Sequence, residues 1–373
     1  MMRSLVEDAL AREPTAGAAA SEAAFMTQDQ RVDAELETIL RNLRTNIKII
    51  GVGGGGTNTI QRIYDEGIVG AELYAANTDA QHLLQLHAPH KILLGRRVTR
   101  GLGAGALPQI GEEAAREAED ELKKLLADTH ICFVTCGLGG GTGTGGAAVV
   151  ARTAKELGAL TIAVATLPFR GEGKMRMENA EWGLERLRDS ADTVIIIPND
   201  KLLEVVPRLS LNAAFKVADE VLMRAIKGLT EVITRPGLVN LDFNDVKTIM
   251  KGAGVAMIGL GESDAPGDDR IQEAIEMALN SPMLEVDISE ANGVLIDVIG
   301  GTDMTISEAE RAAEEIQSRV GPNARIIWGA AVDPAMDKTV RVMIVATGVK
   351  SRQILGKPGE RKYKGVGEVD LVR

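Results

Sequence analysis

The sequence predicts an α/β protein, in which a parallel, Rossmann-like sheet is followed by a long helix and a second, smaller α/β unit. Two observations predict this fold class. Short, almost continuously apolar segments alternate with segments of helical periodicity, which is typical of parallel strands that are covered on both faces. Glycine-rich stretches follow several apolar segments, and in such a sheet the loops after successive strands gather along one edge.

Composition narrows the class of protein. The chain has 373 residues and a net charge of −11, and 45% of its residues are apolar, which suits a soluble protein of about two domains. The acidic balance argues against nucleic acid as a partner, because phosphate neutralisation needs a basic face. No apolar run reaches the ~20 residues of a membrane span, and the acidic start of the chain makes a poor signal peptide. We therefore expect a cytoplasmic protein that does not insert into a membrane.

The two ends of the chain differ from its centre. Residues 1 to about 30 are rich in Ala, Glu and Ser and are predicted to be disordered or loosely helical, whereas Arg31–Thr45 has the spacing of an amphipathic helix. Residues 1–45 are therefore an N-terminal extension. Residues 351–373 turn polar and are expected to form a flexible tail.

Between these ends, strands and helices alternate. The first α/β unit spans 46–210, with strands expected in "NIKII", "AELYA", "HICFVT", "LTIAVATLPF" and "DTVIII". Residues 211–234 have apolar side chains at helical spacing over a broad face, so this helix is expected to lie buried between two lobes. The second unit, 235–350, has strands expected in "VAMIGLG", "NGVLIDVIG", "ARIIWGAAVD" and "TVRVMIVATGV".

The most distinctive stretch is "GLGGGTGTGG", Gly137–Gly146, which lies between a predicted strand and a predicted helix. Its ordered flanks disfavour a flexible linker. Glycine N–H groups at the start of a helix can approach an anion without Cβ obstruction, and Thr142 and Thr144 add hydroxyl donors. The stretch therefore predicts a site for a phosphate chain.

Two further glycine loops bear on the identity of the ligand. Gly51, Gly53 and Gly56 have the spacing of a dinucleotide-binding loop, with Asp79 as a possible ribose ligand. A third loop lies at Thr99–Gly105. Three such loops on one sheet edge suit a mononucleoside triphosphate better than a nicotinamide cofactor. A dinucleotide-binding oxidoreductase is kept as the alternative.

The cysteines and histidines predict no metal site. Cys132 and Cys136 lie four apart in one strand, too far apart to bridge easily, and are expected to be core thiols of a protein in a reducing compartment. The chain has four histidines, and no Cys/His cluster has metal-ligand spacing.

The motifs together carry a family resemblance. "GGGTGTGG", "IGVGGGGTNTI", "TLPFRGEGKMRM" and "ITRPGLVNLDFNDVKTIM" resemble the tubulin/FtsZ superfamily, and within it most closely the archaeal FtsZ proteins, over about Asn46–Arg352. The resemblance implies binding of GTP or GDP with Mg²⁺, head-to-tail assembly of identical subunits into protofilaments, GTP hydrolysis completed at the contact between subunits, and a role in cell division at mid-cell.

The resemblance also assigns nucleotide-binding residues. They are Gly54, Gly55, Gly56, Thr57 and Asn58 in the first loop, Gly141, Thr142 and Gly143 in the signature, Glu172 and Arg176 on the ribose side, and Phe215 and Asp219 at the base. Spacing alone would allow a surface ion pair for Glu172 and Arg176, and a core Phe with a solvated Asp for the last two. With the resemblance, Phe215 stacks on the purine and Asp219 accepts hydrogen bonds from N1–H and the amine of guanine.

The resemblance places catalysis in "NLDFNDV". Asp242 and Asp245 would orient the attacking water at the neighbouring subunit's nucleotide, with Asn240 helping. The alternative is an N-terminal helix cap with an acid in the first turn. The tail would dock a membrane-tethering division protein or remain unbound. A GTP-binding paralogue that does not hydrolyse GTP is the remaining alternative, and the presence of both acids argues against it.

Overall fold

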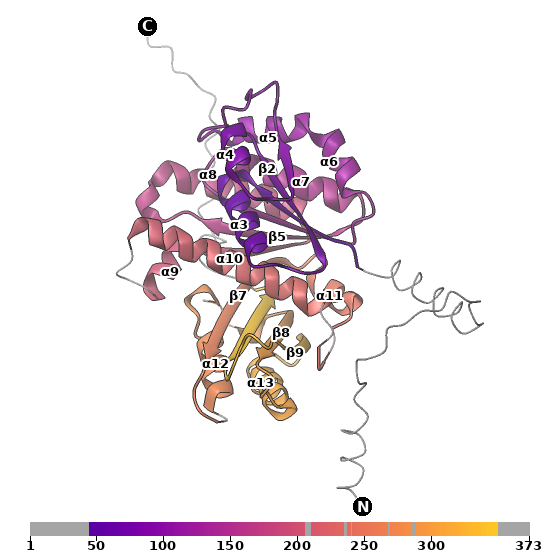
Figure 1. Ribbon diagram of the computed structural model, residues 1–373, viewed down its shortest axis with the longest axis vertical. Coiled ribbons are helices and arrows are strands. Elements are labelled where there is room, and N and C mark those ends of the chain that lie inside the picture. Colours follow the sequence, from indigo (N-terminus) through magenta and orange to yellow (C-terminus); the bar gives the residue numbers. More distant parts are fainter. Residues whose placement is uncertain are drawn as a thin grey trace, which may run out of the picture. The chain divides into compact units, whose positions relative to one another are not determined.

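The structure is a computed structural model that describes residues 45–205, 210–234, 237–239, 241–267, 269–284 and 288–349 (Figure 1). The expectations for 1–30, for the helix up to Arg44, for Asn240 and for the tail lie outside the described residues. Within the described part, no helix combines the length and apolar character that a bilayer crossing requires.

The described strands form one sheet in the order β3-β2-β1-β4-β5-β6-β7-β10-β8-β9. The strands are β1 (Ile47–Val52), β2 (Ala71–Asn77), β3 (His90–Leu93), β4 (Ile131–Gly137), β5 (Leu160–Leu167), β6 (Thr193–Pro198), β7 (Gly254–Ser263), β8 (Gly293–Gly300), β9 (Arg325–Val332) and β10 (Val340–Thr347). From β3 to β7 all neighbours are parallel. The predicted parallel sheet is therefore correct for this part.

The parallel arrangement that was predicted for the first unit does not extend to β10. This strand runs antiparallel to both of its neighbours, β7 and β8. Only residues 333–339 separate it from β9, and a parallel return needs a crossover of a dozen residues or more. The second α/β unit also does not form a separate sheet, because β7 pairs with β6.

Helices cover both faces of the sheet. One face carries α3 (Gly53–Asp65), α4 (Ala80–Gln85), α9 (Asn199–Val205), α10 (Leu211–Thr234) and α11 (Phe243–Met250). The other carries α5 (Pro108–Glu117), α6 (Glu119–Leu126), α7 (Thr142–Glu156), α8 (Lys174–Ser190), α12 (Asp269–Leu279) and α13 (Ile306–Arg319). Neighbouring strand residues supply opposite faces: Ile49 packs with the first set and Ile50 with the second.

The long helix α10 lies at the centre, between the part with β1–β6 and the part with β7–β10 (Figure 1). Its residues Leu222, Ala225, Ile226 and Leu229 are buried, which confirms the expectation of a largely buried helix. The cysteines are also as expected: Cys132 and Cys136 are free and buried, and burial raises the pKa of both thiols to about 12.

The helix after the main glycine stretch begins earlier than predicted. It starts at Thr142, inside the stretch. The reason is close packing against α5: a Cβ on Gly145 would lie 1.9 Å from the carbonyl oxygen of Pro108, and a Cβ on Gly111 would lie 2.2 Å from that of Gly141. The second half of the stretch therefore serves helix packing.

Candidate functional site

A cavity of about 360 Å³ lies where the carboxyl ends of β1, β4, β5 and β6 meet the beginning of α10. All three predicted glycine loops reach it, which confirms that they share one sheet edge. The lining residues are Gly54, Gly55, Asn58, Gly105, Gly137, Leu138, Gly140, Gly141, Thr142, Gly143, Thr166, Pro168, Glu172, Arg176, Asn199, Phe215, Ala218 and Asp219.

Two helices begin at the cavity without a side-chain cap. Val52 precedes α3 and Gly141 precedes α7, and in the described part no side chain caps either helix. Neither first turn contains an acidic residue. Asp79 caps α4 and Thr305 caps α13. α5, α6 and α8 also lack a side-chain cap, but α5 and α6 contribute no residue to the cavity lining and α8 contributes only Arg176. Because both uncapped ends carry partial positive charge, the cavity favours an anion with several oxygens.

The backbone at and just before the start of these helices is held in a fixed shape. Gly53 and Gly139 have φ angles of 74° and 108°, which favour glycine. The N–H of Gly139 donates to Thr144 Oγ1 at 2.9 Å, and its carbonyl accepts from Asn179 Nδ2 at 3.3 Å. Thr144, expected to offer its hydroxyl to the ligand, is buried and holds the loop instead. Thr142 lines the cavity, with its hydroxyl 2.6 Å from that of Thr78.

The opposite wall of the cavity offers an aromatic ring and a carboxylate. Phe215 is 37% exposed, and its ring packs edge-on against Phe169 at a centroid distance of 5.2 Å. Asp219 lies one turn further along α10. Burial raises its pKa to about 6, although the guanidinium of Arg62, 3.7 Å away, acts in the opposite direction. The half-exposed ring and the mostly buried acid differ from the core Phe and solvated Asp that spacing alone allowed.

The predicted ribose-side residues form an ion pair at the rim. Arg176 Nη1 lies 2.6 Å from Glu172 Oε2, and the other oxygen of Glu172 accepts from the N–H of Phe169. The side chain of Glu172 is 12% exposed and that of Arg176 is 51% exposed. Both line the cavity, so the ion pair and a ligand contact are compatible.

Two of the predicted binding residues stand behind the cavity lining. A Cβ on Gly56 would lie 2.3 Å from the carbonyl oxygen of Thr135, so this glycine allows α3 to approach β4. Thr57 is fully buried, and its hydroxyl donates to the carbonyls of Gly53 and Gly54 at 2.8 and 3.1 Å. Their direct contact with a ligand stays a prediction.

Comparison with known proteins identifies the family. Residues 46–207 match the GTPase domain of the Tubulin/FtsZ family, and residues 254–350 match the C-terminal domain of the FtsZ family. Cell division protein FtsZ 1 of Archaeoglobus fulgidus is 59% identical over the full length of both chains. The chain belongs to the FtsZ family.

Other FtsZ proteins show the same likeness. Cell division protein FtsZ of Haloferax mediterranei is 53% identical over 99% of this chain and 98% of its own length. A solved FtsZ dimer of M. jannaschii is 54% identical, covers 88% of this chain and 94% of its own, and superposes with a TM-score of 0.83. Most residues that line the cavity therefore lie in the part of the chain that matches the GTPase domain, whereas Phe215, Ala218 and Asp219 lie just beyond it.

The acid pair expected to act in FtsZ catalysis lies away from this cavity. Asp242 and Asp245 are exposed at the start of α11. Asp242 caps the helix and accepts from the N–H of Asn244 at 3.2 Å, so the cap geometry of the alternative interpretation is present. The cavity meets α10 near its beginning, α11 follows its end, and a helix of 24 residues is about 36 Å long.

The site does not support the dinucleotide alternative. That alternative needs Asp79 at a ribose, but the Asp79 side chain accepts from the N–H of His82 and caps α4. Asp79 is also not among the residues that line the cavity.

Asn199 is a site residue that the sequence analysis missed. It lines the cavity, it is 4% exposed, and its Oδ1 has no hydrogen-bond partner among the described residues. Such an atom is suited to accept from a ligand. Asn199 directly follows β6, so its place at the carboxyl edge of a parallel sheet was the available signal.

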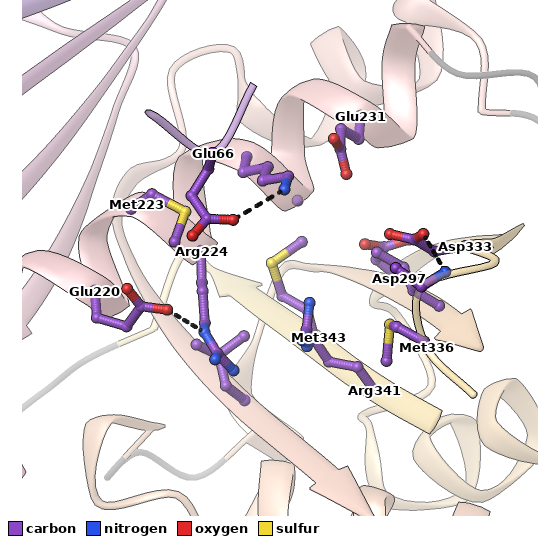
Figure 2. Close-up of a pocket in the computed structure, with 15 residues that line it drawn as sticks. Glu66, Glu220, Met223, Arg224, Glu231, Asp297, Asp333, Met336, Arg341 and Met343 are labelled. Carbon is purple, nitrogen blue, oxygen red and sulfur yellow. Dashed lines mark hydrogen bonds and ion pairs between the residues drawn. The ribbon is translucent and has the colours of Figure 1, made fainter. Parts of the chain in front are cut away.

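A second cavity, of about 290 Å³, lies between α10 and the strands β7, β8 and β10 (Figure 2). Asp297 of β8 and Glu231 of α10 face it. Asp297 is 2% exposed, and its Oδ1 has no partner in the described ranges. Burial, together with the charge of Glu231, raises the pKa of Asp297 to about 8, while Arg341 acts in the opposite direction.

Proposed function

We propose that this chain is a GTP-dependent polymerising GTPase of the cell division ring, which assembles head to tail and completes GTP hydrolysis between subunits. One observation carries the proposal. Two uncapped helix ends converge on one cavity, while an exposed acid pair lies at the far end of α10. On this proposal, each chain would hold the two halves of a hydrolytic site on different parts of its surface.

The nucleotide would lie across the cavity. The N–H groups of α3 and α7, with Gly54, Gly55, Gly141 and Gly143, would bind the phosphates. Glu172 and Arg176 would contact the ribose. Phe215 would stack on the base, and Asp219 with Asn199 would read its polar edge. The Asp219 carboxylate favours guanine, because adenine has no N1–H to donate.

Hydrolysis would need a second copy of the chain. Phosphoryl transfer depends mainly on positioning and charge stabilisation. Asp242 and Asp245 of one subunit would orient the attacking water at the neighbour's nucleotide, with Asn240 assisting. Because the two contact surfaces differ, the assembly does not close on itself and forms a filament. The relatives named as cell division proteins, and the M. jannaschii FtsZ dimer, support self-association.

Mg²⁺ is proposed as a companion of the nucleotide. In the described ranges, no group of three Asp, Glu, His or Cys side chains could hold a metal ion. We therefore expect the ion to be held by phosphate oxygens and water, where it would offset their charge, and we derive no step through it.

The remaining expectations belong to the same proposal. Residues 46–210 would form the GTP-binding domain, 211–234 the central helix, and 235–350 the domain that activates hydrolysis in the next subunit. The protein would act in the cytoplasm at mid-cell. A membrane-tethering division protein would bind residues 351–373.

The first experiment measures GTP turnover per subunit as protein concentration rises, with ATP as control and light scattering recorded in parallel. We expect turnover that is specific for GTP, negligible below a threshold concentration, and rising together with scattering. Turnover per subunit that is independent of concentration would mean that one chain holds the complete site. GTP binding and assembly without turnover would favour the non-hydrolysing paralogue.

A further inference from the structure

His82 links three segments beside the nucleotide cavity. It lies on α4, where its N–H donates to Asp79 Oδ1 at 3.0 Å. Its ring nitrogen Nε2 is 3.1 Å from Asn58 Oδ1, and Nδ1 is 3.0 Å from Asn77 Nδ2. Asn58 lines the cavity, whereas His82 and Asn77 do not.

The hydrogen bonds of Asn77 determine the tautomer of His82. Asn77 Oδ1 accepts from the N–H of Thr78 at 2.8 Å and lies 3.4 Å from the N–H of Asp79. The amide group of Asn77 is therefore oriented with Nδ2 toward His82, because the reverse orientation would break these contacts. Nδ1 of His82 must accept, so the proton of the neutral ring is on Nε2.

The same reasoning orients Asn58. The Nε2–H of His82 donates to Asn58 Oδ1, which leaves the Nδ2 group of Asn58 as the part of this side chain that can contact a ligand. An Nδ2 group only donates, whereas Oδ1 only accepts. Beside two uncapped helix ends, a donor adds to the affinity for an anion, and an acceptor would oppose it.

We propose that His82 is a positioning residue for nucleotide binding, which holds Asn58 with its amide N–H groups toward the phosphate chain of GTP. The inference rests on the proposed function. It assigns His82 no contact with the nucleotide and no part in the hydrolytic step. His82 affects GTP affinity through Asn58, because the hydrogen bond between the two side chains determines whether the amide nitrogen or the amide oxygen of Asn58 faces the ligand.

The test compares GTP dissociation constants of the full chain, measured below the assembly threshold, in a double-mutant cycle. His82→Ala and Asn58→Ala should each weaken GTP binding by about three- to tenfold. The double variant should bind no more weakly than Asn58→Ala alone, because His82 acts through Asn58. At saturating GTP, kcat of His82→Ala should equal that of the unsubstituted chain.

Two further variants separate positioning from folding. His82→Gln can donate to Asn58 and accept from Asn77, so it should recover most of the lost affinity. His87→Ala removes an exposed histidine just beyond α4 and should bind GTP as the unsubstituted chain does. Additive losses in the double variant, no loss in His82→Ala, or no recovery in His82→Gln would overturn this inference alone. No GTP binding by the unsubstituted chain would overturn the proposed function as well.

Discussion

At the scale of single residues, Asp219 shows how its environment adapts a common side chain to its proposed task. The acid lies in a cavity wall, where burial favours the protonated form and Arg62 favours the charged form. Burial dominates, and the pKa rises to about 6. A carboxylate that reads guanine must be ionised, because a protonated carboxyl group can no longer accept from both donors of the base.

GTP affinity should therefore depend on pH through Asp219. Above about pH 6 the carboxylate is present and affinity is constant, and below it affinity should fall by up to about tenfold per pH unit as protons compete with the base. Titration calorimetry with GTP between pH 5 and pH 8 is the measurement. Asp219→Asn should bind GTP weakly with a flat profile; an unchanged slope in this variant would assign the pH dependence to another group.

Single residues also show which parts of the site could not be predicted from the sequence. Glycine and hydroxyl types at a strand–helix junction predict a phosphate site, and the cavity contains Gly54, Gly141 and Thr142 as expected. Residue type does not distinguish a glycine that faces a ligand from one that allows two backbones to touch, as Gly56 does. The orientation of Asn58 depends on His82, a contact between side chains 24 positions apart.

At the scale of elements, glycines bring α5 and α7 into contact. Gly145 of α7 lies so close to Pro108 that an added Cβ would overlap its carbonyl group. This contact supports the helix whose first turn faces the cavity. The order of strands and helices could be predicted from periodicity, but the start of α7 could not, because it depends on how closely α5 approaches.

Gly145→Ala should lower the free energy of unfolding by about 1–3 kcal/mol through overpacking. Helix propensity alone would act in the opposite direction, by up to about 1 kcal/mol, so the sign distinguishes the two effects. Urea unfolding without nucleotide gives the value. Gly171→Ala is the matched control, because a Cβ there meets no atom within 4 Å. A Gly145→Ala protein as stable as this control would mean that α5 and α7 can separate without cost.

The direction of β10 is the main fold feature that element patterns did not predict. An apolar strand has the same alternation whichever way it runs, so the eight residues of β10 do not indicate its direction. The short link from β9 to β10 was the available signal. The pairing of β7 with β6 joins the two units into one sheet and involves three residue pairs. The sequence of neither strand indicates this pairing.

At the scale of the whole molecule, α10 separates the proposed nucleotide cavity from the acid pair. Asp245→Ala should bind GTP and assemble but hydrolyse GTP poorly. Thr142→Arg should not bind GTP, because the arginine side chain would fill the phosphate-binding part of the cavity. In a mixture of the two variants, Asp245→Ala contributes an intact cavity and Thr142→Arg contributes an intact acid pair. GTP turnover in the mixture should exceed the sum of the separate activities. A mixture that co-assembles without such recovery would contradict a site shared between subunits.

The second cavity predicts a pH dependence of stability. An unfolded Asp297 releases its proton near its ordinary pKa of 3.8, whereas the folded one keeps it until about pH 8. Between these values ionisation favours the unfolded state, so stability should fall as pH rises, by up to about 1.4 kcal/mol per pH unit. Asp297→Asn should remove this decline in urea unfolding at pH 5, 6.5 and 8. Asp264→Asn changes an exposed acid and should keep the decline of stability with pH. Identical slopes of stability against pH in both variants would mean that Asp297 is ionised in the folded chain.

The place of β10 in the sheet has a consequence for biosynthesis. Strands β1–β6 pair with partners that are neighbours or near-neighbours in sequence order, so this part can form while later residues are still being made. β7 and β8 are synthesised before β10, yet β10 lies between them. A nascent chain therefore carries two open strand edges until β10 leaves the ribosome, and such edges readily pair with other chains. Translation that stops before Val340 should thus yield a product with a formed first half and a marked need for chaperones.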